Sequence, residues 1–482
     1  MTLKKHFFHR LLTGALICTV ALSPLQSFAA QEQLEAESQA AYAKTIESNS
    51  WENWPTGPSV YAQSAIVMEA DSGVILYAKD MEEKNYPASI TKIMTALVTL
   101  EHCELDEEIE YSYHATHSIE YGSSSIARTE GEILTVEETL YGLMLASANE
   151  CANALAEHIA GSIEEFAVLM NEKAKELGCV NTHFANANGL HDENHYTCAY
   201  DMALITRAAL QNEDFRRISG EDYYTLRATN KNPDELLIQN HHYMISSYKT
   251  SKYLDDTVFS GKTGYTSDAL NTLVTCGTRN DMDVIVVTMR TRSSGERGVP
   301  LFTDTQALLD YANNFHKINI SENEETFVVG NAYDFSVKPE DTVSTASLIS
   351  IDDKACVILP NQVSFQDTSP SITFEEGPDG TTPYLTYEYA GQTVGKASIA
   401  LEDLAPEPTD TLEEATAEKT RFIMINIRVV IIVLAVILCI LLLALFIYRF
   451  YVRNQAKIRK AVQIYQKRRF NARRRYRRKK RR

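Results

Sequence analysis

An uninterrupted apolar run near the C-terminus, residues 429–447, most constrains how this chain can fold. It holds 19 apolar residues in a row, and at about 1.5 Å rise per residue a helix of that length crosses a hydrocarbon layer of about 30 Å. Residues 449–482 carry 17 Lys/Arg and no acid, whereas all 64 Asp/Glu precede the run, against 25 Lys/Arg in residues 31–427. The positive-inside rule therefore predicts a transmembrane helix over 429–448, a basic cytoplasmic tail over 449–482 and an extracytoplasmic position for the preceding chain.

The N-terminus has the pattern of a secretory signal peptide over residues 1–30. Lys4, Lys5 and Arg10 precede an apolar stretch at 11–22, and small residues suited to cleavage follow at 27–30. Export permits disulfides without requiring them. The six cysteines outside the signal and the membrane run are scattered, with no CxxC or Cys/His ligand spacing, so we expect single buried thiols, no metal site and no cofactor.

Turn signals and periodicity divide the chain between these ends. Residues 31–57 are Glu/Ala/Ser-rich and are predicted to be a linker, and residues 403–428 form an acidic linker before the membrane. Strands are expected at 64–68, 74–77, 271–276 and 284–289, and helices at 87–100, 136–145, 151–160 and 302–315. This order predicts an α/β (α+β) layer domain over 58–318. Short strands with Gly/Pro/Asp turns predict a small all-β domain over 319–402.

Ser89 and Lys92 place a hydroxyl and an amine three residues apart at the start of a predicted helix, so both project from one face. A serine hydroxyl is a weak nucleophile until a base takes its proton, and a desolvated lysine can be neutral enough to do so. Taken alone, S-x-x-K also fits a solvated helix start. Two further motifs change that balance: Ser147-Ala148-Asn149 lies 58 residues after Ser89 between two predicted helices, and Lys262-Thr263-Gly264 lies 115 residues after Ser147, just before the predicted hairpin.

Together these motifs resemble the active-site signature of penicillin-recognising serine enzymes, and the wider match resembles the D-alanyl-D-alanine carboxypeptidase family of low-molecular-mass penicillin-binding proteins. The similarity extends over residues 58 to about 400. It departs from the family at Ala148, where Gly is frequent, and in having a transmembrane helix where an amphipathic anchor is more usual. The resemblance is carried by residues 87–95 (PASITKIMT), 145–150 (LASANE), 184–190 (FANANGL), 195–197 (HYT), 201–203 (DMA), 261–266 (GKTGYT) and 390–395 (AGQTVG).

The resemblance implies a fold and a reaction. The fold is a β-lactamase/transpeptidase-like domain with an antiparallel sheet flanked by helices. Ser89 would attack the penultimate D-Ala carbonyl of peptidoglycan peptides ending in D-Ala-D-Ala, with Lys92 as general base and Ser147 as proton donor to the leaving amine. β-Lactam antibiotics would acylate the same serine. Substrate contacts would come from Asn149 to the backbone amide, from Lys262 and Thr263 to the terminal carboxylate, and from Gly264 of the same motif. The N–H groups of Ser89 and Tyr265 would form the oxyanion hole.

Three other functions are weighed against this one. A class A-like β-lactamase shares two motifs, but the E-x-x-L-N loop it needs is absent between Ser147 and Lys262. A catalytically silent penicillin-binding scaffold would not require the intact motif residues. A Ser/His/Asp hydrolase would need a G-x-S-x-G elbow, which the sequence lacks. The basic tail is expected to lie on anionic lipid rather than to bind nucleic acid.

Overall fold

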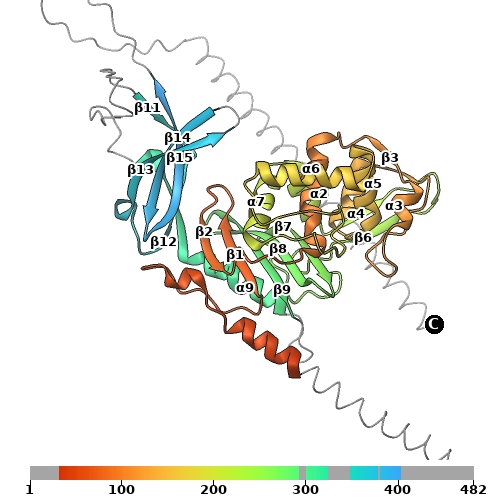
Figure 1. Cartoon of the computed structure of the whole chain (residues 1–482), viewed down its shortest axis with the longest axis horizontal. Coiled ribbons are helices and arrows are strands. Elements are labelled where there is room, and N and C mark those ends of the chain that lie inside the picture. Colours follow the sequence, from red (N-terminus) through yellow and green to blue (C-terminus); the bar gives the residue numbers. More distant parts are fainter. Residues whose placement is uncertain (1–31, 293–299, 324–347, 378–379, 403–482) are drawn as a thin grey trace, which may run out of the picture. The chain divides into compact units, whose positions relative to one another are not determined.

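The computed structural model describes residues 32–292, 300–323, 348–377 and 380–402 (Figure 1). The predicted signal peptide, acidic linker, transmembrane helix and basic tail lie outside these residues. Among the described residues, none of the helices combines the length and apolar character needed to span a membrane.

A five-stranded antiparallel sheet, in the order β2-β1-β9-β8-β7, organises the first part of the chain. The predicted hairpins are both present, and Asn280 and Asp281 turn between β8 and β9 with φ of 47° and 59°. The strands are β1 (Ser64–Glu69), β2 (Ile75–Lys79), β7 (Val258–Thr266), β8 (Leu270–Arg279) and β9 (Met282–Thr291), and two short ribbons pair β3 (Glu108–Glu110) with β4 (Ile133–Thr135) and β5 (Tyr223–Leu226) with β6 (Leu236–Gln239).

Helices cover both faces of this sheet (Figure 1), because alternate residues of its central strands face opposite cores. Ile285 and Val287 of β9 pack with the helices that carry the predicted motifs, whereas Val284 and Val286 pack with α9. The helices are η2 (Ala88–Thr91), α2 (Lys92–His102), α3 (Tyr113–His117), α4 (Val136–Met144), α5 (Asn149–Ala160), α6 (Ile163–Glu176), α7 (Ala199–Ala209), α8 (Glu213–Gly220), α9 (Pro300–Tyr311) and η3 (Ala312–Asn314). This mixed layered fold is the class that the sequence predicts.

Local signals set the helix ends much as predicted. Thr135 and Glu138 form the reciprocal capping box of α4. Gly161, with φ of 81°, ends α5 in the left-handed conformation that favours glycine. The predicted helix over 302–315 ends earlier, because Tyr311 leads into η3 and Phe315 already pairs with Pro360 in a strand.

A second antiparallel sheet follows, in the order β10-β12-β15-β14-β13 with β11 added to β15. Its first strand begins at Phe315, so the predicted domain boundary at residue 318 falls inside β10. The strands are β10 (Phe315–Asn319), β11 (Leu348–Ile351), β12 (Cys356–Pro360), β13 (Ser369–Gly377), β14 (Gly380–Tyr389) and β15 (Gln392–Glu402), with the short helices α10 (Ile320–Asn323) and η4 (Phe365–Asp367) between strands.

The segment 31–57, predicted to be a linker, is instead packed on the first sheet where it is described. Residues 32–42 are helical and η1 (Glu47–Ser50) follows. The Trp54 side chain is buried and donates to Leu76 O at 2.8 Å, and the buried Lys79 ammonium donates to Ala41 O at 2.7 Å. The prediction was wrong because composition does not reveal apolar residues, such as Ile46 and Trp54, that complete a core formed elsewhere in the chain.

Candidate active site

Ser89 lies in η2, on a strained turn that leads directly into α2. Ala88 has φ of 51°, a left-handed value that costs a non-glycine residue free energy. The turn is fixed by Thr272 Oγ1, which donates to Pro87 O at 2.8 Å. It is also closely covered by Gly189, where an added Cβ would lie 2.0 Å from Ala88 O. The serine is thus held by packing against two distant segments.

Lys92 begins α2, and its fully buried side chain lies at the centre of the site. Its Nζ is 3.0 Å from Ser89 Oγ and 2.8 Å from Asn149 Oδ1, and it also donates to the main-chain oxygen of Asn188. Burial, helped by the nearby charge of Lys262, lowers the pKa of Lys92 well below its ordinary value.

These contacts fix the direction of the Lys92 lone pair. A neutral amine has two protons and one lone pair, and the oxygens of Asn149 and Asn188 can only accept hydrogen bonds. With both protons directed to these oxygens, the lone pair is left for Ser89, whose hydroxyl then donates to Nζ. This is the geometry that a general base for a serine nucleophile requires.

Ser147 and Asn149 come from the turn between α4 and α5. Ser147 has φ of 59°, and its buried Oγ has no hydrogen-bond partner among the described residues. The turn is closed by Ala148 N, which donates to Gly142 O at 3.0 Å, and by Asn149 N, which donates to Ser124 O at 2.9 Å. A strained backbone and an unsatisfied buried hydroxyl at one residue are typical of a functional position.

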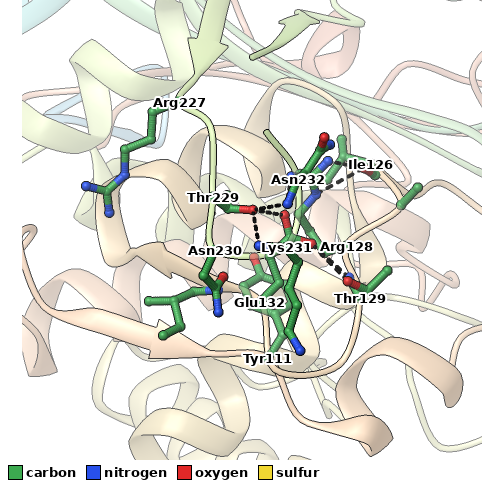
Figure 2. Close-up of polar contacts among 12 residues, drawn as sticks. Tyr111, Ile126, Arg128, Thr129, Glu132, Arg227, Thr229, Asn230, Lys231 and Asn232 are labelled. Atoms are coloured by element: carbon green, nitrogen blue, oxygen red, sulfur yellow. Dashed lines mark hydrogen bonds and ion pairs between the residues drawn. The ribbon is translucent and has the colours of Figure 1, made fainter. Parts of the chain in front are cut away.

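The loop of Ser124, whose main-chain oxygen accepts from Asn149 N, continues into a segment that a buried ion pair anchors (Figure 2). Arg128 Nη1 and Glu132 Oε1 are 2.8 Å apart, with side chains only 4% and 2% exposed. Glu132 also accepts from Thr229 Oγ1 at 2.7 Å, and Arg128 Nη2 donates to Ile126 O at 3.0 Å. Satisfying both charges in this way fixes the loop that supports the Ser147 turn.

Lys262, Thr263 and Gly264 lie in β7, an edge strand of the sheet. A Cβ added to Gly264 would lie 2.9 Å from Ser89 N, so β7 passes directly against the Ser89 backbone. The Lys262 side chain is buried and donates to Thr263 O at 3.0 Å, and burial lowers its pKa to about 7. Tyr265, the next residue, is 66% exposed.

The structure thus brings together residues from all three predicted motifs. Ser89, Lys92 and Asn149 are linked by hydrogen bonds, and Gly264 contacts the nucleophile's backbone. Ser147 makes no hydrogen bond to another motif residue within the described part of the chain. The contact between Asn149 and Lys92 was not predicted, because the motif pattern assigns Asn149 to the substrate only.

Sequence reasoning also missed two supporting residues, Asn188 and His195, although both lie in segments that carry the family resemblance. Asn188 offers its main-chain oxygen to Lys92. His195 accepts from Ala185 N at Nδ1, so its Nε2 carries the proton and donates to Thr91 Oγ1 at 2.8 Å. Burial lowers the pKa of His195 to about 3, which keeps the ring neutral. These roles arise from contacts across about 100 residues of chain and leave no local spacing signal.

Comparison with known proteins identifies the family. The family model described as D-alanyl-D-alanine carboxypeptidase matches residues 52–293. The chain is 36% identical over 258 residues to D-alanyl-D-alanine carboxypeptidase DacF of Bacillus subtilis, covering 52% of this chain and 62% of that protein. It is 30% identical over 257 residues to DacB2 of Mycobacterium tuberculosis, covering 53% of this chain and 82% of that protein.

A solved D-alanyl-D-alanine carboxypeptidase from M. tuberculosis H37Rv aligns with a TM-score of 0.48 at 28% identity, over 55% of this chain and 95% of that one. The chain thus spans less than two thirds of the B. subtilis relative and most of the mycobacterial one. On the match of the family model to half of its residues, the chain belongs to the D-alanyl-D-alanine carboxypeptidase family of serine peptidases.

Proposed function

We propose that this protein is a serine-type D-Ala-D-Ala carboxypeptidase that removes the terminal D-alanine from peptidoglycan peptides through an acyl-enzyme on Ser89. The observation that carries the proposal is the Lys92 amine, buried and 3.0 Å from Ser89 Oγ, with its other neighbours able only to accept hydrogen bonds. Such an amine can take the serine proton as the bond to the substrate forms.

Acylation would proceed by transfer of the Ser89 proton to Lys92 while Oγ bonds to the penultimate D-Ala carbonyl carbon. The resulting oxyanion would be stabilised by the N–H groups of Ser89 and Tyr265, which the approach of β7 to Ser89 supports. Ser147 Oγ, buried and without a partner among the described residues, would pass its proton to the leaving D-Ala amine as the C–N bond breaks and would regain one from Lys92, which had accepted it from Ser89. Water then adds to the ester and releases the shortened peptide.

Recognition of a free C-terminus would come from Lys262. Its charged form makes a strong hydrogen bond with a carboxylate in a buried site. A buried ammonium without a counter-charge is unfavourable, so pairing it with the substrate carboxylate favours the complex. Thr263 and Gly264 of the same strand would complete this subsite. A β-lactam offers a similar carbonyl and carboxylate, so it should acylate Ser89 as well.

The β-lactamase alternative needs a carboxylate that activates the deacylating water. No carboxylate lies within hydrogen-bonding distance of Ser89 or Lys92 in the part of the chain that the structure describes. A silent scaffold would have no use for a serine and lysine paired in this geometry. Both alternatives are therefore less well supported than the carboxypeptidase.

We further propose that the enzyme acts outside the cytoplasmic membrane. The secretory pattern at 1–30, the 19 apolar residues at 429–447 and the 17 basic residues after them support a single-pass protein with its catalytic domain outside and its tail in the cytoplasm. Peptidoglycan substrates lie on the same side.

The direct test uses the detergent-solubilised full chain and a pentapeptide ending in D-Ala-D-Ala. Released D-alanine is expected with the parent protein and none with Ser89→Ala, because Ser89 supplies the hydroxyl that is hydrogen-bonded to Lys92 Nζ among the described residues. If the protein bound labelled penicillin but released no D-alanine, the carboxypeptidase proposal would be wrong, and a scaffold or an acyl-transfer role would be favoured. Equal release by Ser89→Ala would refute the nucleophile.

Lys92→Ala tests the base separately from the nucleophile. Acylation by labelled penicillin, followed by gel fluorescence with time, is expected to slow by roughly 10²- to 10⁴-fold, the usual contribution of a general base. Lys354→Ala, at an exposed lysine of the second sheet region, is the matched control and should acylate at the parent rate. If Lys92→Ala were acylated at the parent rate, a group other than Lys92 would be the general base.

A further inference from the structure

Three metal-ligating side chains of different chemistry meet on the surface away from the active site. Cys103 Sγ, a carboxylate oxygen of Glu107 and a ring nitrogen of His158 all lie within 4.8 Å of one another. Cys103 caps the C-terminal end of α2, His158 lies in the last turn of α5, and Glu107 immediately precedes β3. Local Cys/His spacing does not indicate this group, because Cys103 and His158 are 55 positions apart in the sequence.

The distances fit a tetrahedral cation. His158 Nε2 and Glu107 Oε2 are 3.2 Å apart, close to the edge of a tetrahedron whose Zn–N and Zn–O bonds are about 2.0–2.1 Å. The other carboxylate oxygen, Oε1, accepts from Glu104 N at 2.7 Å, and this fixes the orientation of the carboxylate. Cys103 Sγ lies within 4.8 Å of both atoms, near enough for a side-chain adjustment to bring it to the usual Zn–S bond of about 2.3 Å.

The surroundings favour positive charge. A hollow of about 330 Å³ is lined by Cys103 and Glu107 together with the carboxylates of Glu101, Glu104 and Asp214. Two of these carboxylates are already paired in the described structure, Glu101 with Lys173 at 2.8 Å and Asp214 with Arg217 at 2.7 Å, which leaves Glu104 and Glu107 as the carboxylates without a Lys or Arg partner there. Carboxylates concentrated at one hollow raise the local concentration of cations and their rate of arrival.

We propose that Cys103, Glu107 and His158 form a binding site for a single divalent cation of the zinc type, with water as the fourth ligand. A thiolate, an imidazole and a carboxylate together select Zn²⁺ over the hard cations Mg²⁺ and Ca²⁺, which prefer oxygen ligands alone. The site is independent of the proposed function, since none of its ligands contacts a residue of the active site.

Its position gives the cation a structural role. Helices α2 and α5 begin at Lys92 and Asn149, which are joined by a hydrogen bond in the active site, and end near Cys103 and His158. The cation would therefore connect the far ends of the two helices that carry catalytic motif residues. Binding to the folded state alone raises the stability of the fold.

Cobalt(II) provides a spectroscopic test, because a tetrahedral Co²⁺ site with a thiolate ligand absorbs in the near ultraviolet and visible. The untagged full chain in detergent, freed of metal by a chelator, is titrated with Co²⁺ alone and then with Zn²⁺. We expect saturation at one equivalent, displacement of the absorption by Zn²⁺ and a higher thermal unfolding midpoint with Zn²⁺. Absence of a thiolate-to-cobalt band at one equivalent would overturn the site.

Substitutions assign the ligands. Cys103→Ser and His158→Ala should each weaken Zn²⁺ binding by on the order of 100-fold or more, since loss of an outer-shell partner alone typically costs 10- to 100-fold. Cys179→Ser removes another partly buried thiol and is the matched control, with Zn²⁺ affinity expected to match the parent. Penicillin acylation of Ser89 confirms that each variant is folded. A cobalt band that persists in folded Cys103→Ser, or disappears in Cys179→Ser, would contradict the assignment.

Discussion

The proposed mechanism gives opposite tasks to two buried lysines of this site. In that mechanism, Lys92 must be neutral to accept a proton, whereas Lys262 must be charged to bind a carboxylate. Burial lowers the pKa of both, and the charge of Lys262 lowers that of Lys92 further. The charge of Lys262 therefore favours the deprotonated form of Lys92, in addition to the substrate contact that we propose for Lys262.

The pKa of Lys262 gives the first prediction. It is lowered to about 7, so the charged form is present below that pH and is lost as the pH rises. For a pentapeptide with a free carboxylate, kcat/KM should fall on the alkaline side of about pH 7, by roughly 30- to 150-fold overall if the charge-assisted bond contributes ~2 to 3 kcal/mol. Steady-state rates of D-alanine release across pH measure this.

Lys262→Arg and an amidated peptide are the controls for this profile. Arginine stays charged, so the alkaline fall should move to higher pH. A peptide amidated at its C-terminus has no carboxylate to pair with Lys262. Its rate should be lower throughout and should not fall as Lys262 loses its charge. The same alkaline fall with both peptides would mean that Lys262 serves proton transfer or structure.

At the scale of elements, the site depends on how closely β7 approaches η2. Only glycine at position 264 allows this approach, because an added Cβ would lie 2.3 Å from Thr272 Oγ1 and 2.9 Å from Ser89 N. Position 189 also requires glycine, because an added Cβ there would lie 2.0 Å from Ala88 O of η2. The nucleophile is therefore positioned by backbone contacts that side-chain variation cannot replace.

Gly264→Ala should separate β7 from η2 and slow acylation by about 100-fold, the effect typical of a displacement near 1 Å at a reacting group. Gly277→Ala, in the adjacent strand β8, is the matched control. An added Cβ at Gly277 would lie 3.4 Å or more from the nearest neighbouring atoms. Penicillin acylation rates and circular dichroism of both variants test this. Parent-like acylation by Gly264→Ala would show that the approach is not critical.

Two buried histidines connect elements of the site and should make the fold sensitive to acid. His195 is hydrogen-bonded to Thr91 of η2. His242 Nε2 shares a hydrogen bond with Thr275 Oγ1 of β8 at 2.8 Å and lies against Gly261 of β7. Burial lowers the pKa of each to about 3 from an ordinary value of 6.5. The unfolded chain therefore binds more protons than the folded one in this range.

The stability that these histidines provide is complete above pH 6.5 and is lost as the pH falls from 6.5 towards 3. Each should contribute a slope of roughly 1.4 kcal/mol per pH unit to the free energy of unfolding. In His195→Gln, whose amide can still donate to Thr91, that part of the slope should disappear. Urea unfolding at about pH 7 and about pH 5 measures it, with the exposed His191→Gln as control. An unchanged slope in His195→Gln would contradict this account.

At the scale of the whole molecule, the division of charge predicts the topology of the protein. Protease added to intact cells should remove the catalytic domain and spare a tag fused after Arg482, because the positive-inside rule predicts a cytoplasmic position for the 17 basic residues of 449–482. A cytoplasmic protein assayed in parallel controls for lysis. A tag digested in intact cells would reverse the orientation.

The sequence alone determined the local elements and indicated which motif residues would meet at the candidate site. The hairpins at β1/β2 and β8/β9, the capping box of α4 and the end of α5 at Gly161 follow from signals within a few residues. Ser89, Lys92, Asn149 and Gly264 could be predicted because the three motifs mark them in order.

Tertiary structure decided what depends on contacts between distant parts of the chain. The carbonyl of Asn188 at Lys92, the packing of Trp54 and the meeting of Cys103 with His158 join residues that no periodicity relates. A main-chain oxygen carries no residue identity, and a tryptophan in a polar segment has no repeat around it. Such contacts arise only when separate elements pack into one core, so their roles could not be predicted from local sequence.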